Sequence, residues 1–149
     1  MTPLERIGKL GLKTVKFDTG SGGQAFWRGC EIAGVMSQLT RLELAWVMVA
    51  YINTSSEKEL EYMSLCIVPE LVKRFEFEAL MASKIVKMAC RERMQRKELS
   101  NRMRSVVLGV PKSTYARHQD KYDDALKFIN NVIDRIEESS SSKLATAML

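Results

Sequence analysis

The chain has few of the residues that hold metal ions or form disulfides. Its 149 residues include three cysteines, Cys30, Cys66 and Cys90, and one histidine, His118. A structural zinc site takes four Cys or His ligands from closely spaced pairs, and the sequence contains no such pair. It therefore predicts three reduced, mostly buried thiols and no metal site.

A long apolar run is also absent. None of the apolar stretches approaches the ~18 to 20 residues that are needed to cross a bilayer. Residues 1–6 lack the basic-then-apolar layout of a signal peptide. We therefore expect a cytoplasmic protein with no membrane partner.

Signals of enzymatic chemistry are missing as well. The glycine-rich loop at 19–23 is not followed by the Gly-Lys-Ser/Thr of a phosphate-binding loop. No nucleophile–base pair is found, and the acidic pairs at 123–124 and 137–138 are typical of solvated helix faces. We expect neither enzymatic activity nor a cofactor.

The residues that are present favour helices around a buried core. Apolar residues make up 46% of the chain and charged residues 28%, which is ordinary for a globular protein. Two capping boxes, Thr40 with Glu43 and Ser56 with Glu59, mark the starts of helices. The stretch 44–52 is apolar almost all round and predicts a central core helix, with a β-strand as the alternative. Because few other strand signals compete, the sequence predicts an all-α fold.

The chain divides into three parts. We expect an N-terminal arm with a Gly-rich loop over 1–23, a helical domain over 24–138 and a serine-rich, disordered tail over 139–149. Within the domain a helix is expected at 24–39, and Pro69 should end or kink another helix. The result is a small multi-helix body.

A long C-terminal helix completes this body. It is expected over 113–138 and carries an apolar seam at 115–136. The residues that recur every seven positions, as in a coiled coil, are Tyr115, Tyr122, Ile129 and Ile136. The seam either packs on the body of the same chain or pairs two protomers in a homodimer.

Positive charge is concentrated in one segment. The chain carries a net charge of +5. Residues 84–121 hold eleven Lys and Arg against three acidic residues, whereas the rest of the chain holds 12 basic and 15 acidic residues. A local excess of this kind is typical of polyanion binding, with a solvated helix face as the alternative.

The basic segment contains a helix-turn-helix pattern at about 97–121. The residues expected on the buried face of its first helix are Leu99, Met103, Val106 and Val107. The Gly-Val-Pro sequence at 109–111 should end that helix, because glycine accepts a positive φ and proline prevents continuation. Ser113 and Thr114 would then cap the second helix by accepting its free N–H groups.

Residues 109–118 resemble the turn and recognition helix of bacterial helix-turn-helix proteins. Their sequence is Gly-Val-Pro-Lys-Ser-Thr-Tyr-Ala-Arg-His. Two residues depart from the family pattern. Arg104 stands where an aliphatic side chain is usually buried, and His118 stands near another position that is usually apolar. Tyr115 is expected to pack the turn. The resemblance implies double-stranded DNA as the partner.

The resemblance also implies roles for individual residues. Phosphate oxygens would be held at the start of the recognition helix by Lys112, Ser113 and Thr114. Base edges in the major groove would be reached by Arg117, His118 and Lys121. Further backbone phosphates would be contacted, with an affinity that falls as salt rises, by Arg93, Arg96, Lys97, Arg102 and Arg104.

The order of the elements, with short core helices, a basic helix-turn-helix and a long terminal helix, resembles phage-encoded late-gene regulators. It is similar above all to the Q-type antiterminators, without the zinc-binding insertion that some of them carry. This resemblance implies a transcription regulator that binds promoter-proximal DNA and engages bacterial RNA polymerase in the cytoplasm of the host cell. The alternative is a helical protein-interaction module, such as a phage assembly or packaging adaptor.

Overall fold

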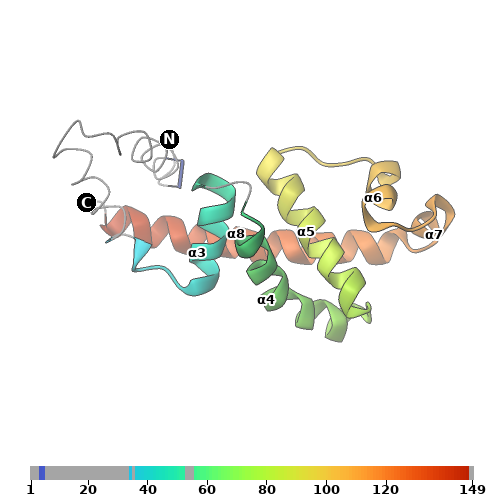
Figure 1. Ribbon diagram of the computed structural model, residues 1–149, viewed down its shortest axis with the longest axis horizontal. Coiled ribbons are helices and arrows are strands. Elements are labelled where there is room, and N and C mark those ends of the chain that lie inside the picture. The colour runs from blue at the N-terminus through green and yellow to red at the C-terminus, as the bar shows by residue number, and fades with distance from the viewer. Residues whose placement is uncertain (1–3, 6–33, 35, 53–55, 148–149) are drawn as a thin grey trace. The chain divides into compact units, whose positions relative to one another are not determined.

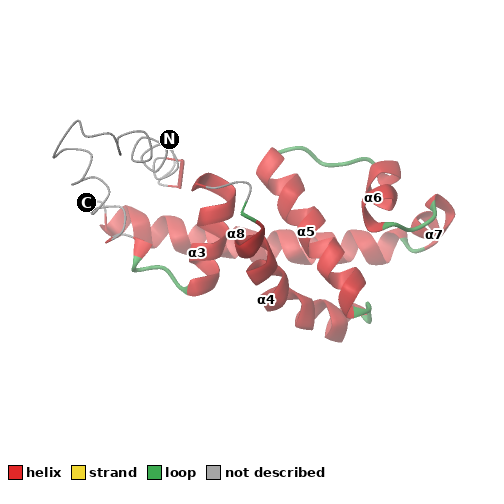
Figure 2. Cartoon of the chain, viewed as in Figure 1, coloured by secondary structure: helices red, strands yellow, loops and turns green. Residues whose placement is uncertain are grey.

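Figure 1 shows the computed structural model of the chain, which describes residues 4–5, 34, 36–52 and 56–147. Within these residues the chain forms helices and connecting loops and no strand (Figure 2). The all-α fold that the sequence predicts is therefore confirmed. The predicted arm at 1–23 and the predicted helix at 24–39 lie almost entirely outside the described residues.

The helices belong to two compact units. In chain order they are α3 (Arg41–Val47), the π-helix η1 (Met48–Ile52), α4 (Glu57–Phe75), α5 (Ala79–Gln95), α6 (Asn101–Leu108), α7 (Lys112–Arg117) and α8 (Gln119–Ala147). Residues 60–134 form one unit, which we call the central unit. Residues 1–59 and 135–149 form the other, the terminal unit. Helix α8 contributes residues to both.

In the terminal unit, α3 begins at the predicted capping box. The Glu43 N–H donates to Thr40 Oγ1 at 3.2 Å, and the Thr40 N–H donates to Glu43 Oε1 at 2.9 Å. The apolar stretch that follows is helical through Ile52, which decides between the helix and the strand in favour of the helix. Its large side chain, Trp46, is buried, as expected of a core helix.

The C-terminal part of α8 completes this unit. Glu137 accepts hydrogen bonds from Trp46 Nε1 at 3.3 Å and from the Tyr51 hydroxyl at 3.2 Å. Lys143 forms an ion pair with the buried Glu43 at 2.6 Å. Contacts between residues about 90 to 100 positions apart therefore join α3 and η1 to α8.

The predicted disordered tail at 139–149 is wrong as far as the structure describes it, because α8 continues to Ala147. Ile136, Ser140 and Leu144 are buried and follow one another at four-residue intervals. This spacing places them on one helical face. Packing thus holds the serine run in the helix. The sequence did not indicate this, because serine has a low helix propensity.

In the central unit, α4 and α5 pack together. The hydroxyls of Ser64 and Ser83 lie 2.8 Å apart, and Lys87 forms an ion pair with Glu61. Helix α4 does not end at Pro69 but continues to Phe75. Ile67 before the proline and Leu71 after it are both buried. Their packing outweighs the loss of the one backbone hydrogen bond that proline cannot form.

The helix predicted over 113–138 is divided in two. Helix α7 ends at Arg117, His118 adopts φ −112° and ψ 22°, and α8 begins at Gln119. The rings of Tyr115 and Tyr122 stack with centroids 4.7 Å apart and planes within 9°. Seven residues of unbroken helix would separate them by about 10.5 Å along the axis, so the break at His118 allows the rings to stack.

The seam at 115–136 is covered within the single chain. Its buried side chains are Tyr115, Tyr122, Ala125, Leu126, Ile129, Ile133 and Ile136. Packing on the same chain, one of the two alternatives for the seam, is therefore what the structure shows. A homodimer through the same side chains stays a prediction, and it would have to expose them first.

Candidate nucleic-acid interface

The predicted helix-turn-helix corresponds to α6, a short turn and α7, which lie next to each other in the central unit (Figure 1). Ser100 caps α6, because its hydroxyl accepts the Met103 N–H at 3.3 Å. The helix ends at Gly109, whose φ of 71° is left-handed. The Gly109 N–H donates to Val106 O at 3.1 Å and the Val110 N–H to Ser105 O at 3.0 Å. These two hydrogen bonds form a Schellman motif, so α6 ends at Gly109 as the sequence predicts.

Position 109 favours glycine because of its positive φ, and not because a side chain would lack space there. A Cβ placed there would meet only Lys84 Nζ, at 3.8 Å, which is ordinary contact. The same distance shows that the Lys84 ammonium of α5 approaches the C-terminal end of α6. A cation at this position is favoured by the partial negative charge of the helix end. The sequence places Lys84 in the basic segment but gives no sign that it lies beside the turn.

Helix α7 starts differently from the prediction. It begins at Lys112, directly after Pro111, and Ser113 and Thr114 lie inside it. Pro111 occupies the capping position and provides no side-chain hydrogen bond. The expected Ser/Thr cap is therefore wrong. Proline with its φ of −59° already has the conformation that precedes a helix, so the chain turns into α7 without a polar cap.

A buried ion pair ties α6 to α5. Arg104 donates to Glu92 Oε1 at 2.8 Å, and the same oxygen accepts the Leu99 N–H at 2.8 Å. Asp123 of α8 approaches the Arg104 guanidinium at 3.8 Å. The side chains of Arg104 and Glu92 are only 14% and 9% exposed. One carboxylate thus fixes both the loop before α6 and the first half of α6 itself.

The ion pair accounts for the burial of Arg104, which departs from the pattern that the sequence resembles. Burial by itself would lower the pKa of the Arg104 guanidinium, but the hydrogen bond and charge of Glu92 raise it above its usual value. The arginine thus stays charged in a position that is usually apolar. Its charge is neutralised inside the protein by Glu92, so Arg104 has a structural role and does not have the exposed position that the predicted phosphate contact requires.

Most of the other predicted contact residues lie at the surface of the same unit. The exposed ones are Arg96, Lys97, Arg102, Lys112, Ser113, Arg117 and His118. Thr114 is half-buried. The structure therefore brings exposed cations from the end of α5, from α6 and from α7 into one unit of 75 residues, 60–134.

Two predicted contact residues are engaged elsewhere. Lys121 Nζ lies 4.5 Å from the centroid of the Phe77 ring, a cation–π contact. Arg93 forms an ion pair with Asp134 of α8. Both side chains are half-buried, and both contacts bind α8 to the rest of the central unit. We therefore give them a smaller part in any DNA contact.

Tyr115 packs the turn, as predicted. It is buried, and its ring stacks on Tyr122, which in turn stacks on Phe77 with centroids 5.5 Å apart. Burial raises the pKa of the Tyr115 hydroxyl, partly offset by the neighbouring Arg104. Aromatic rings from α7, α8 and the loop after α4 thereby hold α7 against the unit, and its polar residues point outward.

The predicted buried face of α6 is wrong. Met103, Val106 and Val107 are 48%, 66% and 41% exposed, whereas Ser105 and Leu108 are buried. Apolar periodicity identifies a face but not the side on which the rest of the protein lies. Here the Glu92–Arg104 pair and Ser105 occupy the inner side, and the apolar stripe faces solvent.

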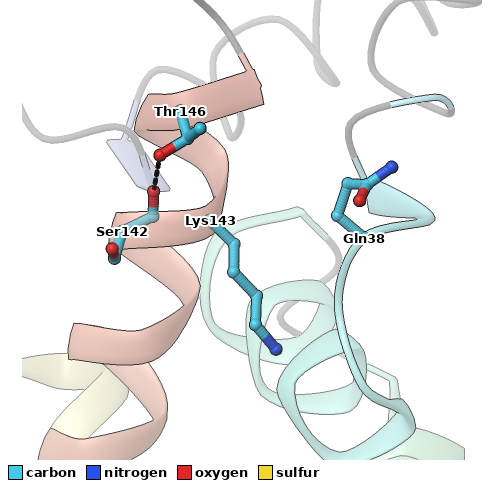
Figure 3. Close-up of a pocket in the computed structure, with 4 residues that line it drawn as sticks. All are labelled: Gln38, Ser142, Lys143 and Thr146. Atoms are coloured by element: carbon cyan, nitrogen blue, oxygen red, sulfur yellow. Dashed lines mark hydrogen bonds between the residues drawn. The ribbon is translucent and has the colours of Figure 1, made fainter.

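The thiols and the one described pocket do not form a second site. Burial raises the pKa of the Cys90 thiol to about 12, whereas Cys66 is exposed, so the prediction of mostly buried thiols holds for Cys90 only. Cys30 lies outside the described residues. In the terminal unit an open pocket is lined by Gln38, Ser142, Lys143 and Thr146 (Figure 3). Its lysine is already paired with Glu43.

No family model, curated protein or solved structure matches the chain. Among the residues that the structure describes, no three His, Cys, Asp or Glu side chains lie together as metal ligands would. In the same part of the chain, no helix is long and apolar enough to cross a membrane.

Proposed function

We propose that the chain is a sequence-specific DNA-binding transcription regulator that contacts double-stranded DNA through α6, α7 and the end of α5. The observation that carries this proposal is the set of exposed cations on a helix-turn-helix in which basic residues outnumber acidic ones. Between positions 91 and 118, all of which the structure describes, the acidic residues are Glu92 and Glu98. Glu92 is buried against Arg104, so Glu98 is the one exposed acid in this segment.

The dimensions of α7 suit a DNA groove. An α-helix with its side chains is about 10–12 Å across, which a major groove about 12 Å wide admits, and the six residues of α7 are about 9 Å long. Arg117 and His118 lie exposed at its C-terminal end and would read base edges. Lys112, Arg102 and Lys97 would contact phosphates, and these contacts would give affinity without specificity.

Selection of bound duplexes from a random pool tests this proposal. The full chain should enrich a defined sequence, and anisotropy titrations with that duplex should show an affinity that falls steeply with salt. Arg102→Ala should reduce the slope of log K against log salt by about 1, because one phosphate contact is lost. Arg117→Ala should relax the preference at one base pair by about 1–3 kcal/mol.

Lys127→Ala provides the matched control. Lys127 is an exposed cation of the same unit on α8, outside the basic segment, and its removal should change neither the slope nor the preference. Binding that is absent, or that falls equally in all three variants, would exclude this surface as a DNA interface.

The finer proposal is a late-gene antiterminator that acts with RNA polymerase, as the resemblance to the Q-type proteins implies. It is supported by the combination of a basic helix-turn-helix with a long terminal helix in one short chain. Transcription in vitro on a template with the selected site upstream of a terminator tests it. The chain should increase readthrough, and Arg117→Ala should abolish the increase.

A helical protein-interaction module is the second candidate function. The exposed apolar stripe on α6 favours it, because a helix that only contacts DNA needs no such stripe. The stripe itself consists of side chains other than the exposed cations that would contact DNA.

A further inference from the structure

Helix α6 has an exposed apolar face in addition to the side that it buries. Met103, Val106 and Val107 are spaced i, i+3 and i+4 and share one face, and all three are exposed. The inward face carries Arg104, Ser105 and Leu108. An amphipathic helix of a globular protein normally buries its apolar face and exposes its polar one. Packing of the central unit therefore does not account for the apolar face of α6.

We propose that this stripe docks an acidic, amphipathic helix of a partner protein. A helix that lies against α6 would bury the three side chains between apolar anchors at its own i, i+3, i+4 and i+7 positions. Helix α6 has eight residues and is about 12 Å long, which matches two turns of a partner helix. The proposal goes beyond DNA binding and does not depend on it.

Charge complementarity decides the chemistry of the partner. Arg102 is exposed and lies four residues before Val106, on the adjacent part of the same helix. Lys97 precedes α6 and Lys112 follows its turn, and both are exposed. Glu98 is the one exposed acid in the described segment 91–118. The exposed charges on α6 and next to its two ends, which we call the rim of the stripe, are therefore mostly positive, and they favour acidic side chains over basic ones.

The same charges disfavour two other occupants. A second copy of the chain would bring an identical positive rim against the first, with like charges opposed. The segment 6–33 of this chain carries five basic and two acidic residues, so it does not complement the rim either. A partner with exposed carboxylates beside its apolar anchors fits both features of α6.

The position of the stripe gives the docking a consequence. Val106 and Val107 lie two to three residues before Gly109, and α7 begins three residues after it. A partner on α6 would thus be held next to the helix that carries Arg117 and His118. The chain would present a bound protein beside its exposed cations, and this proximity follows from the length of the turn alone.

A pair of labelled peptides tests the proposal with the full chain. One 16-residue helical peptide carries Leu at positions i, i+3, i+4 and i+7 and Glu at the outward positions; the other has Lys in place of each Glu. In fluorescence anisotropy the acidic peptide should bind at least about tenfold more tightly than the basic one. Val106→Ser and Met103→Ser should each weaken the acidic peptide by about tenfold.

Leu80→Ser is the matched control. Leu80 is 71% exposed on α5 of the same unit, so its substitution removes at least as much exposed apolar surface as the substitution of Val106, which is 66% exposed. It should change peptide affinity less than twofold. Because all three substituted side chains are exposed, circular dichroism and thermal unfolding should match the parent chain, which shows that affinity changes come from the lost contact.

Four results would overturn the proposal. The acidic peptide could fail to bind, the basic or a sequence-scrambled peptide could bind equally well, or Leu80→Ser could weaken binding as much as Val106→Ser. Light scattering could also show a dimer that Val106→Ser dissociates, in which case a second copy occupies the stripe. A loss of DNA binding in Arg117→Ala with peptide affinity unchanged separates this surface from the proposed DNA interface.

Discussion

Arg104 departs from the helix-turn-helix sequence pattern, and in the structure it forms a buried ion pair that joins α6 to α5. Its guanidinium pairs with a carboxylate that also receives the Leu99 N–H, so the start of α6 depends on a buried charge having its partner. The cost of burying these two ions is offset only when both are present. Arg104, one of the two residues that depart from the helix-turn-helix pattern, thus joins α6 to α5.

We predict that Arg104→Met lowers the free energy of unfolding by about 3–5 kcal/mol, because the buried Glu92 carboxylate loses its partner. Urea denaturation measures the change. The double substitution Glu92→Met with Arg104→Met should recover most of the loss, since no unpaired charge remains. Arg102→Met, at the exposed neighbouring arginine, should cost no more than about 0.5 kcal/mol. Equal costs at positions 102 and 104 would contradict the structural role of the pair.

At the scale of the elements, the ends of α5 and α6 share one hydrogen-bonding motif but differ in the residue at the left-handed position. Helix α5 ends in the same kind of motif as α6: the Arg96 N–H donates to Arg93 O at 3.3 Å and the Lys97 N–H to Glu92 O at 3.2 Å. The left-handed position, however, is held by Arg96 with φ 53° instead of by glycine. A side chain there costs about 1 kcal/mol.

We predict that Arg96→Gly stabilises the protein by about 0.5–1 kcal/mol and weakens DNA binding at the same time. The first effect comes from relief of backbone strain, and the second from the loss of one cation, which lowers the salt slope by about 1. Thermal unfolding and anisotropy measure the two effects.

Glu76→Gly is its counterpart. Glu76 has φ 59° at the end of α4 and should gain similar stability without weaker DNA binding. If Arg96→Gly leaves DNA affinity unchanged, the end of α5 does not contact DNA.

The elements that the sequence could predict are those set by local chemistry. The capping box at Thr40 and the turn at Gly109 depend on residues within a few positions, and both are confirmed. The outcomes it could not predict depend on distant partners. Pro69 stays within α4, and α8 runs through four serines, because buried neighbours hold them.

The candidate site follows the same division. Exposure of Lys112 and Arg117 follows from the polar pattern of α7 and could be predicted. The inward position of Arg104 and the outward apolar stripe of α6 could not, because a pattern gives the faces of a helix but not which face the rest of the fold covers. Glu92, the residue that decides this, lies on another helix.

At the scale of the whole molecule, the stability of the terminal unit should depend on pH through Glu43. Burial by itself would raise the pKa of this carboxyl, but the Lys143 ammonium and the hydrogen bonds from Thr40 outweigh burial and lower it to about 2, from 4.5. The unfolded chain therefore binds a proton at higher pH than the folded chain. The stabilisation is complete above about pH 4.5 and is lost as the pH falls toward 2.

We predict that about 3 kcal/mol of the unfolding free energy is lost between pH 4.5 and pH 2 through Glu43. Denaturant titrations at a series of pH values measure it. Glu43→Gln should flatten this part of the profile, and Lys143→Met should flatten it partly, because the carboxyl loses the cation that lowers its pKa. An unchanged profile in Glu43→Gln would show that other groups control acid unfolding.

The division of the chain also has a consequence for its synthesis. The central unit is one continuous stretch, 60–134, so all of its residues are synthesised before the last part of the terminal unit. Glu43, in contrast, meets Lys143 one hundred residues later in the chain. The sequence of the central unit is therefore complete while Glu43 of α3 still lacks the partner that neutralises its buried carboxylate.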